Sequence, residues 1–395
     1  MRPIINLALL LFFAVRLSAQ SPGVTLSGIV ADSLTGKPLD GISVFLNSTS
    51  RGTTTHSNGQ FQLTVPRGTY QLVFSAIGYS TTVVTVSDNH LPTDFRIKLK
   101  QQATELAAVT VEPYEKRGWA KYGRFFWTRF IGTGANASSC TILNKEVLRF
   151  YFYKRSNRLN VTAKEPLIIE NNALGYVLEY RLEGFVSDFN TNIVTYFGYP
   201  FFREMTPKKE GRQQTWAEQR YMTYRGSMMH FMRSLYAGHS IRESFFVQRR
   251  VTIPNAEKHR VKRIYRPDFQ SPGLFPIDTL HYFWTVLREP ELVTMDLTID
   301  PDSLVSTRPD QSKALYFDGQ LTVTYGVNNA NDSLRQSGIR LISAQPITVE
   351  ENGNYYPSKE ILTSGFWGQS EKIANLLPLD YQPVPPRPPF ISPNK

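Results

Sequence analysis

The sequence contains a single cysteine, Cys140, among 395 residues, so an intramolecular disulfide is excluded. A lone cysteine is most often a small buried hydrophobic residue, and a nucleophilic role would require a histidine beside it in space. Beyond residues 1–20, no stretch approaches the roughly 20 consecutive apolar residues that a membrane-spanning helix needs. The sequence therefore predicts no transmembrane helix, although peripheral association with a membrane stays open.

The motifs that accompany common catalytic sites are also missing. No histidine begins a His-x-x-Glu or His-Glu-x-x-His motif, the patterns typical of zinc peptidases. The chain has no Gly-x-Ser-x-Gly nucleophile elbow, no glycine-rich phosphate loop and no dinucleotide fingerprint. We therefore predict no catalytic residue, no metal and no cofactor, and we interpret all six histidines as ordinary surface or core residues: His56, His90, His230, His239, His259 and His281.

What the chain has is aromatic side chains and positive charge. Hydrophobic residues make up 41% of the chain and aromatic residues 13%, which is enough to build packed cores and favours β structure. The formal charge is +11, from 44 basic and 33 acidic residues. Outside the cytoplasm, such a balance suits anionic envelope surfaces or acidic glycans, and we expect no nucleic-acid partner.

Residues 1–20 have the pattern of a secretory signal peptide. Arg2 supplies a positive start, an apolar run follows at residues 4–15, and small residues allow cleavage after Ala19 or Gln20. We therefore expect an exported protein.

Two alternating runs organise the first 112 residues. Phe61, Leu63 and Val65 form the first, and Tyr70, Leu72 and Phe74 form the second. Period-2 alternation places each set on one face of a strand, and the Pro-Arg-Gly turn between them predicts a β-hairpin. Similar patterns predict a seven-stranded Greek-key β-sandwich over residues 21–112, with strands near 24–31, 41–47, 60–65, 69–76, 79–87, 94–99 and 107–112.

An ordered series of short motifs in this region resembles the carboxypeptidase-like regulatory domain. The series runs through Ser27-Gly28-Ile29-Val30, Thr35-Gly36-Lys37-Pro38-Leu39, Asn58-Gly59-Gln60-Phe61, Gly68-Thr69-Tyr70 and Ser75-Ala76-Ile77-Gly78-Tyr79. The resemblance implies a prealbumin-like sandwich. The chain departs from the family pattern at His56, where the family usually has Asp or a similar small polar residue.

This module accompanies metallocarboxypeptidases and also precedes TonB-dependent outer-membrane receptors of Gram-negative bacteria. Leu106–Val111 resembles the strand that ends the module in those receptors. About 280 residues follow it here, too few for a plug and a large barrel, so we do not expect a receptor. The resemblance instead implies the periplasm or the periphery of the outer membrane.

The rest of the chain is predicted to be a β-rich α+β domain of unknown function over residues 126–382. A basic linker at 113–125 precedes it and a proline-rich tail at 383–395 follows it. One prominent helix is expected from a capping box at Thr215–Glu218 to a stop at Gly238. The remaining segments are predicted as strands, including 260–265 and 280–287. Motifs around Tyr224–Ser227, Gly365–Gly368 and Leu376–Tyr381 make residues 113–382 resemble an uncharacterised region of short exported proteins.

Five residues are candidates for ligand binding. The aromatic rings of Trp119, Trp127 and Trp367 could stack on a sugar or peptide, with core packing as the alternative. Lys262 and Arg263 lie in a basic run at residues 258–266 that we predict to be a strand with one cationic face. That face could contact an anionic glycan or a lipid head group, or simply be solvated.

The leading hypothesis is an exported, non-catalytic cell-envelope protein that binds a glycan, another ligand or an envelope protein. The alternative is a carboxypeptidase-like hydrolase that uses the sandwich as an accessory domain. A third hypothesis is a structural module of an outer-membrane assembly. A glycosidase would need two carboxylates about 5–9.5 Å apart in a cleft, a distance that a sequence does not contain.

Overall fold

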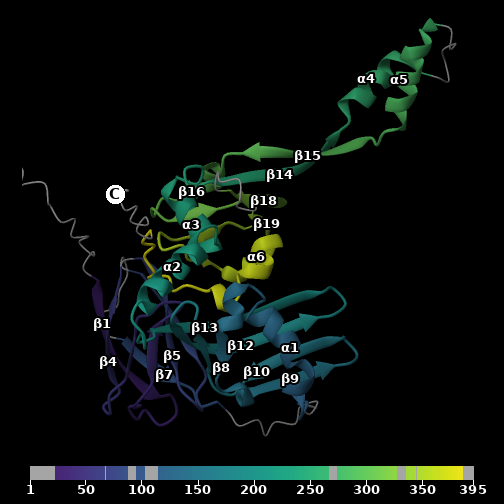
Figure 1. Ribbon diagram of the computed structural model, residues 1–395. Helices are drawn as coiled ribbons and strands as arrows, with labels where there is room; N and C mark the ends of the chain where they lie inside the picture. The colour runs from purple at the N-terminus through teal and green to yellow at the C-terminus, as the bar shows by residue number, and fades with distance from the viewer. Residues whose placement is uncertain are drawn as a thin grey trace, which may run out of the picture. The chain divides into compact units, whose positions relative to one another are not determined.

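The computed structural model describes residues 23–66, 68–87, 95–102, 114–266, 274–326, 335–343 and 345–385 (Figure 1). The predicted signal peptide, the strand at 107–112, His90 and the tail from residue 386 lie outside the described residues. The chain divides into two compact units. Unit 1 comprises residues 1–115, 147–167 and 178–203, and unit 2 comprises residues 116–146, 168–177 and 204–395.

Unit 1 begins with a β-sandwich. One sheet has the order β4-β1-β7 and the other the order β3-β2-β5-β6. The strands are β1 (Val24–Asp32), β2 (Ser43–Leu46), β3 (Gly52–Thr54), β4 (Gln60–Val65), β5 (Thr69–Ser75), β6 (Thr82–Ser87) and β7 (Phe95–Leu99). The predicted fold class, mainly β with an N-terminal sandwich, is confirmed. Sequence analysis did not predict the short strand β3.

The predicted hairpin between β4 and β5 is wrong. Strand β4 pairs with β1, whereas β5 pairs with β2 and β6, so the two alternating runs belong to opposite sheets. Their buried faces meet across the sandwich, where the rings of Phe61 and Phe74 lie 5.5 Å apart in an edge-on arrangement. Alternation identifies which face of a strand is buried but says nothing about its pairing partner, and this is why the prediction failed.

A third sheet of unit 1 contains β9 (Leu148–Tyr153), β10 (Arg158–Ala163), β12 (Tyr176–Asp188) and β13 (Ile193–Glu204). Strand β10 pairs with β9 and β12, and β13 pairs with β12. The end of β13 reaches the sandwich. There Thr49 forms a parallel bridge with Phe201, and the Phe201 ring lies 5.2 Å from that of Phe45.

Unit 2 contains two complete sheets together with strands β8 and β11. The five-stranded sheet has the order β15-β14-β18-β19-β22, the four-stranded sheet has the order β16-β17-β20-β21, and β8 pairs with β11. The bounds are β8 (Cys140–Ile142), β11 (Leu167–Asn171), β14 (Phe245–Pro254), β15 (Leu292–Ile299), β16 (Val305–Thr307), β17 (Lys313–Leu315), β18 (Gln320–Tyr325), β19 (Arg335–Leu341), β20 (Ile347–Val349), β21 (Tyr355–Tyr356) and β22 (Ile361–Ser364).

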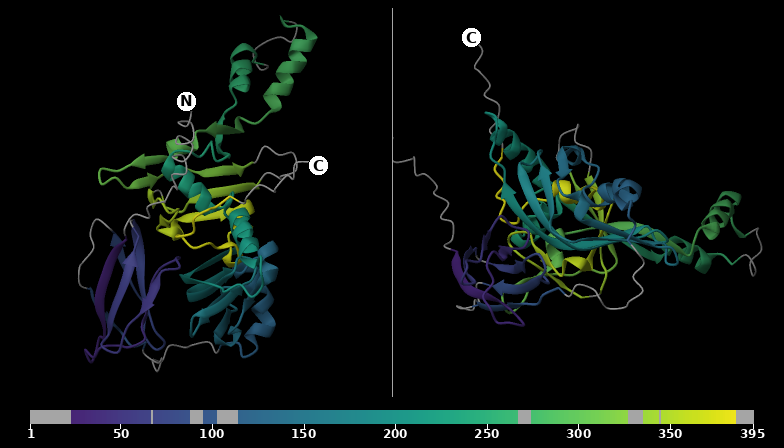
Figure 2. Two further views of the ribbon diagram at one scale, coloured as in Figure 1. Left: turned by 60° about the vertical axis from the view of Figure 1, so that its left-hand side comes forward. Right: turned by 90° about the horizontal axis from the view of Figure 1, so that it is seen from below.

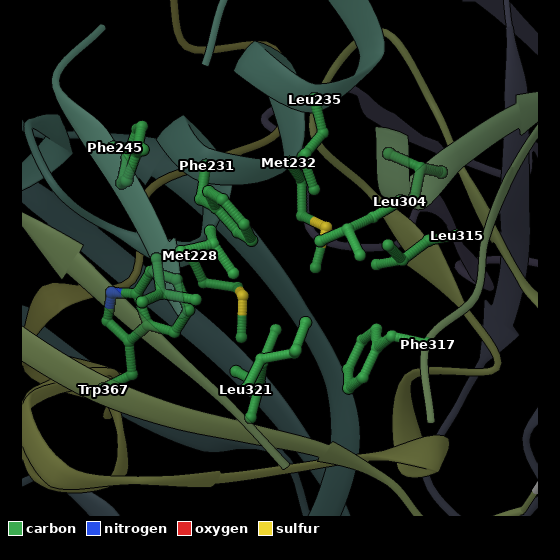
Figure 3. Close-up of a cluster of buried hydrophobic side chains, with 14 of the residues drawn as sticks. Met228, Phe231, Met232, Leu235, Phe245, Leu304, Leu315, Phe317, Leu321 and Trp367 are labelled. Carbon is green, nitrogen blue, oxygen red and sulfur yellow. The ribbon is translucent and has the colours of Figure 1, made fainter. Parts of the chain in front are cut away.

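Six α-helices lie among the described residues, all of them in unit 2: α1 (Gly118–Phe130), α2 (Arg212–Tyr224), α3 (Met228–Ala237), α4 (Ala256–Ile264), α5 (Ile277–Arg288) and α6 (Gly365–Ser370). Helix α3 packs its apolar stripe against the two sheets of unit 2. Figure 3 shows Phe231, Met232 and Leu235 of α3 directed toward Trp367, Leu315 and Phe317 in this core.

The helix expected at 215–238 is divided into α2 and α3. Helix α2 begins three residues before Thr215, whose hydroxyl donates to the carbonyl of Gly211, so the predicted capping box is wrong. The cap lies instead at Ser227, which starts α3 by accepting the backbone N–H of His230. The predicted stop is confirmed, because Gly238 ends α3 with a φ of 67°. Helix α1 likewise begins within the basic segment predicted as a linker.

The strands predicted at 260–265 and 280–287 are wrong, because both segments are helical. Asn255 caps α4 by accepting the N–H of Lys258. Val261 and Tyr265 then pack against Leu280 and Phe283 of α5 in a small separate core. The β-branched and aromatic residues of α5 favour strands by propensity, but their spacing of three residues places them on one helical face, and packing decides.

A half-buried carboxylate at the start of α3 predicts a pH effect. The Glu371 Oε1 atom accepts the N–H of Met228 at 3.4 Å, and burial raises the pKa of Glu371 from 4.5 to about 7. The folded chain thus binds this proton more tightly than the unfolded chain, so the contribution of Glu371 to stability is lost as the pH rises from about 4.5 through 7. We expect Glu371→Gln to raise the free energy of unfolding by about 1–3 kcal/mol at pH 8.

Urea unfolding of both proteins at pH 8 and pH 4.5 measures this effect. The gain should nearly vanish at pH 4.5, where the wild-type carboxyl is already protonated in the folded chain. Glu351→Gln, at an exposed carboxylate, is the control and should change little at either pH. An equal gain from Glu371→Gln at both pH values would contradict the explanation.

Candidate functional site

A cavity of about 390 Å³ lies in unit 1, between the sandwich and the third sheet. Its polar lining comes from the hydroxyl-bearing Ser43 and Ser75 and from the charged Glu179 and Arg181. The remaining lining residues are Gly41, Phe45, Ala76, Ile77 and Pro166. Apolar walls with a few fixed polar groups are typical of sites that bind small molecules.

The charged groups of the cavity come from one face of β12. Residues two apart on a strand point to the same side, so Glu179, Arg181 and Glu183 share a face while Tyr180 and Leu182 are buried on the other. Glu179 forms an ion pair with Arg203 at 2.7 Å. This pair fixes the Glu179 carboxylate beside the cavity.

Arg181 is the least satisfied polar group of the cavity. Its side chain is only 11% exposed, and its Nε atom lies 3.8 Å from a carboxylate oxygen of Glu183. Its Nη1 atom is buried and has no hydrogen-bond partner among the described residues. A buried guanidinium nitrogen without a partner costs free energy that an incoming acceptor could recover.

The sandwich supplies the apolar wall. Phe45 is buried on β2 and is held by the Phe201 ring, so its position does not depend on a ligand. Ile77 follows β5 and is 68% exposed. The site therefore combines a fixed aromatic wall with an exposed aliphatic side chain.

The five residues singled out from the sequence lie on three separate helices. Trp119 and Trp127 are half-buried on α1, and the ammonium of Lys145 lies 5.7 Å from the Trp119 ring. Trp367 on α6 is buried in the core, where its Nε1 donates to the carbonyl of Gly226 at 2.8 Å.

Lys262 and Arg263 both lie on α4. Lys262 forms an ion pair with Glu291 at 2.6 Å, and Arg263 is exposed. The structure therefore joins these two cations on one helix but brings none of the three tryptophans into the cavity of unit 1.

Sequence analysis missed Arg181 and Glu179. The only signal for them was the alternation of charged and apolar residues along β12.

One histidine has an acidic partner. His230 is buried, its Nε2 lies 3.1 Å from Glu243, and its Nδ1 accepts the N–H of Gly226. Burial lowers the pKa of His230 despite the carboxylate, and the backbone donor identifies the neutral ring with its proton on Nε2. Both nitrogens thus hold the junction of α2 and α3.

Among the described residues, no group of three or more His, Cys, Asp or Glu side chains could hold a metal ion.

Cys140 is buried, as predicted. Burial raises the pKa of its thiol to about 12. Because the thiolate is the nucleophilic form, this environment disfavours nucleophilic chemistry at neutral pH.

The motifs of residues 224–227, 365–368 and 376–381 contact one another in unit 2. Arg233 of α3 donates to the carbonyls of Asn352, Leu379 and Tyr381. The Tyr224 ring lies 5.9 Å from that of Tyr381. The Trp367 Nε1 donates to the carbonyl of Gly226, so the three motifs form one structural junction.

Comparison with known proteins identifies the sandwich. Residues 26–111 match the family model of the CarboxypepD_reg-like domain. The regulatory-type domain predicted from the sequence is thus confirmed, over about the first quarter of the chain. No curated protein matches the chain.

Three solved structures show local likenesses. A type II cohesin–X-dockerin complex from Acetivibrio cellulolyticus matches at 24% identity and a TM-score of 0.15, over 19% of this chain and 52% of that one. A DUF3823 family protein from Bacteroides ovatus matches at 11% identity and a TM-score of 0.16, over 47% and 82% of the two chains. A Bacteroides fragilis protein of unknown function, described as membrane-associated, matches at 12% identity and a TM-score of 0.17, over 82% and 93%.

The chain thus spans about half the length of the first of these relatives, and TM-scores this low do not indicate a shared overall architecture. Within the described part of the chain, no helix is long and apolar enough to cross a membrane.

Proposed function

We propose that the chain is an exported, non-catalytic protein of a Gram-negative cell envelope that binds a glycan through the cavity of unit 1. The observation that carries the proposal is the buried Arg181 beside Glu179, two serines and the Phe45 wall. Guanidinium, carboxylate and hydroxyl groups on an apolar surface suit a ligand that presents both hydroxyl groups and C–H faces. The CarboxypepD_reg-like domain, which forms one wall of this cavity, supports a binding role.

Export rests on the sequence pattern of residues 1–20. We propose that the protein resides in the periplasm or at the periphery of the outer membrane. Fractionation of the source bacterium tests this location, and recovery in the cytoplasm would contradict it.

Binding is tested with immobilised envelope glycans and soluble peptidoglycan fragments. The wild-type protein should retain at least one glycan class, and Arg181→Met should weaken that binding by about tenfold or more, because a charge-assisted hydrogen bond contributes about 1.5–3 kcal/mol. Arg158→Met is the matched control. Its guanidinium pairs with Asp188 on the same sheet but is 54% exposed, and it does not line the cavity.

Two outcomes would overturn the proposal. Equal binding by the wild-type protein and Arg181→Met would place the ligand elsewhere. Release of shortened glycans or peptides during incubation with the purified protein would instead favour the hydrolase hypothesis.

A further inference from the structure

An arm extends from the five-stranded sheet of unit 2. We define the arm as residues 250–266 and 274–296, which contain the outer halves of β14 and β15 together with helices α4 and α5. Residues 245–249 of β14 pair with β18, whereas in the described part of the chain residues 250–254 pair with β15 alone. Figures 1 and 2 show the two helices at the end of this two-stranded ribbon, away from the sheets of unit 2.

The arm has its own small core. Val261 and Tyr265 of α4 pack against Leu280, Phe283 and Val286 of α5. At the inner end, Asn255 donates to Glu289, and Lys258 pairs with Glu291 at 3.2 Å. The two helices are thus held together independently of the core of unit 2.

The far end of the arm exposes large aliphatic side chains. Helix α4 ends and α5 begins at this end, where Leu274 is 67% exposed and Ile277 is 71% exposed, with Ile264 at 39%. A group of exposed aliphatic side chains at one end of an element is typical of a surface that contacts a partner or a membrane. We call Ile264, Leu274 and Ile277 the arm tip.

The charge beside the arm tip is positive. Residues 256–266 contain five basic residues and one acidic residue, and the exposed Asp278 follows Ile277 on α5, so residues 256–266 and 274–278 together carry a net charge of +3. Arg260 pairs with Glu257, and Lys258 and Lys262 both pair with Glu291 toward the inner end, so Arg263 and Arg266 are the cations nearest the end of α4. The exposed Arg263 lies one residue from Ile264, so aliphatic and cationic side chains adjoin at the tip.

Trp284 stands behind the tip on the same helical stripe. It is seven residues, or about 10 Å along the helix axis, from Ile277, and 42% of its surface is exposed. Amphipathic helices at a membrane surface bury their apolar residues about 5–10 Å deep, with tryptophan at the head-group level and basic residues facing anionic lipids. The spacing of tip, cations and tryptophan matches this arrangement.

We propose that the arm tip docks on an anionic lipid surface, with Ile264, Leu274 and Ile277 entering the acyl region and Arg263 contacting phosphate groups. Charge complementarity favours this occupant over a second copy of the chain, because two copies of α4 would bring like charges together. The proposal goes beyond the glycan site, which lies in unit 1, and either can fail without the other.

Co-sedimentation of the full-length mature chain with vesicles tests the proposal. The protein should bind vesicles of phosphatidylglycerol and phosphatidylcholine, and binding should weaken with added salt. Leu274→Ser/Ile277→Ser should reduce the bound fraction by about tenfold or more, because each substitution removes several methyl or methylene groups that binding would bury in the acyl region. Met295→Ser on the ribbon is the matched control, because it removes an exposed apolar residue away from the tip.

Quenching by brominated lipid reports depth directly. Tryptophan fluorescence should fall when the wild-type protein binds, and at a matched bound fraction it should fall much less in Trp284→Phe. Equal binding by the wild-type protein and the double variant would overturn the proposal, as would equal binding to vesicles of phosphatidylcholine alone. A dimer in light scattering that Leu274→Ser/Ile277→Ser abolishes and Met295→Ser does not, without vesicle binding, would assign the arm tip to a second copy of the chain. Loss of glycan retention with vesicle binding intact would refute only the proposed function.

Discussion

Replacing Trp367 by alanine is expected to lower the free energy of unfolding by about 3–5 kcal/mol, the range for large aromatic residues in cores. The Trp367 ring is 2% exposed and lies 5.4 Å from the Phe231 ring. Its Nε1 also satisfies the carbonyl of Gly226. The alanine variant would therefore leave a cavity and a buried carbonyl without its donor.

Urea unfolding followed by circular dichroism measures this effect without relying on tryptophan fluorescence. Trp367→Phe should cost less, because it keeps most of the apolar volume and loses only the indole donor. Trp284→Ala is the exposed control and should change stability by less than about 1 kcal/mol. A loss from Trp367→Ala no larger than that of the control would show that α6 does not anchor the core.

Replacing Gly226 by alanine is expected to lower the free energy of unfolding by about 2–5 kcal/mol, from two sources. Its φ of 73° lies in the left-handed region, which costs an L-residue roughly 1–2 kcal/mol. A Cβ atom there would also lie 2.5 Å from a ring carbon of Tyr325, and overpacking of this kind typically costs about 1–3 kcal/mol.

Gly238→Ala separates the two sources. Gly238 has a φ of 67° at the end of α3, and nothing lies within 4 Å of the position that an alanine Cβ would take there. This variant should therefore lose only the conformational part, and the difference between the variants measures the contact with Tyr325. Equal losses would show that the Tyr325 ring moves aside at little cost.

The sequence predicted strands well where side chains alternate. Strand β1 and strand β4 lie within about a residue of the predicted segments, because period-2 burial is a local property of the chain. The pairing of β4 with β1 was missed because pairing depends on contacts between distant segments. The arm was missed for the opposite reason: local propensity of the aromatic run in α5 favoured a strand, and the packing of Phe283 against Tyr265 overrode it.

The candidate site was predicted less well than the fold. Trp367 was singled out because tryptophans often stack on ligands, but the same large apolar ring makes an effective core residue. Arg181 and Ser43 approach the same cavity from different strands. Nothing in the residues between them indicates that they meet, so a site of this kind becomes visible only when the topology is known.

The bridge between Thr49 and Phe201 also affects how the chain folds during its synthesis. The two residues are 152 positions apart (201 − 49). At a synthesis rate of about 5–20 residues per second, Phe201 emerges roughly 8–30 s after Thr49. During that interval the side chains of Phe45 and Val73, which later pack against Phe201 of β13, are not yet buried by it. A newly made sandwich therefore exposes an apolar face until β13 of the third sheet is synthesised, and this delay is the period in which a chaperone would have the largest apolar surface to bind.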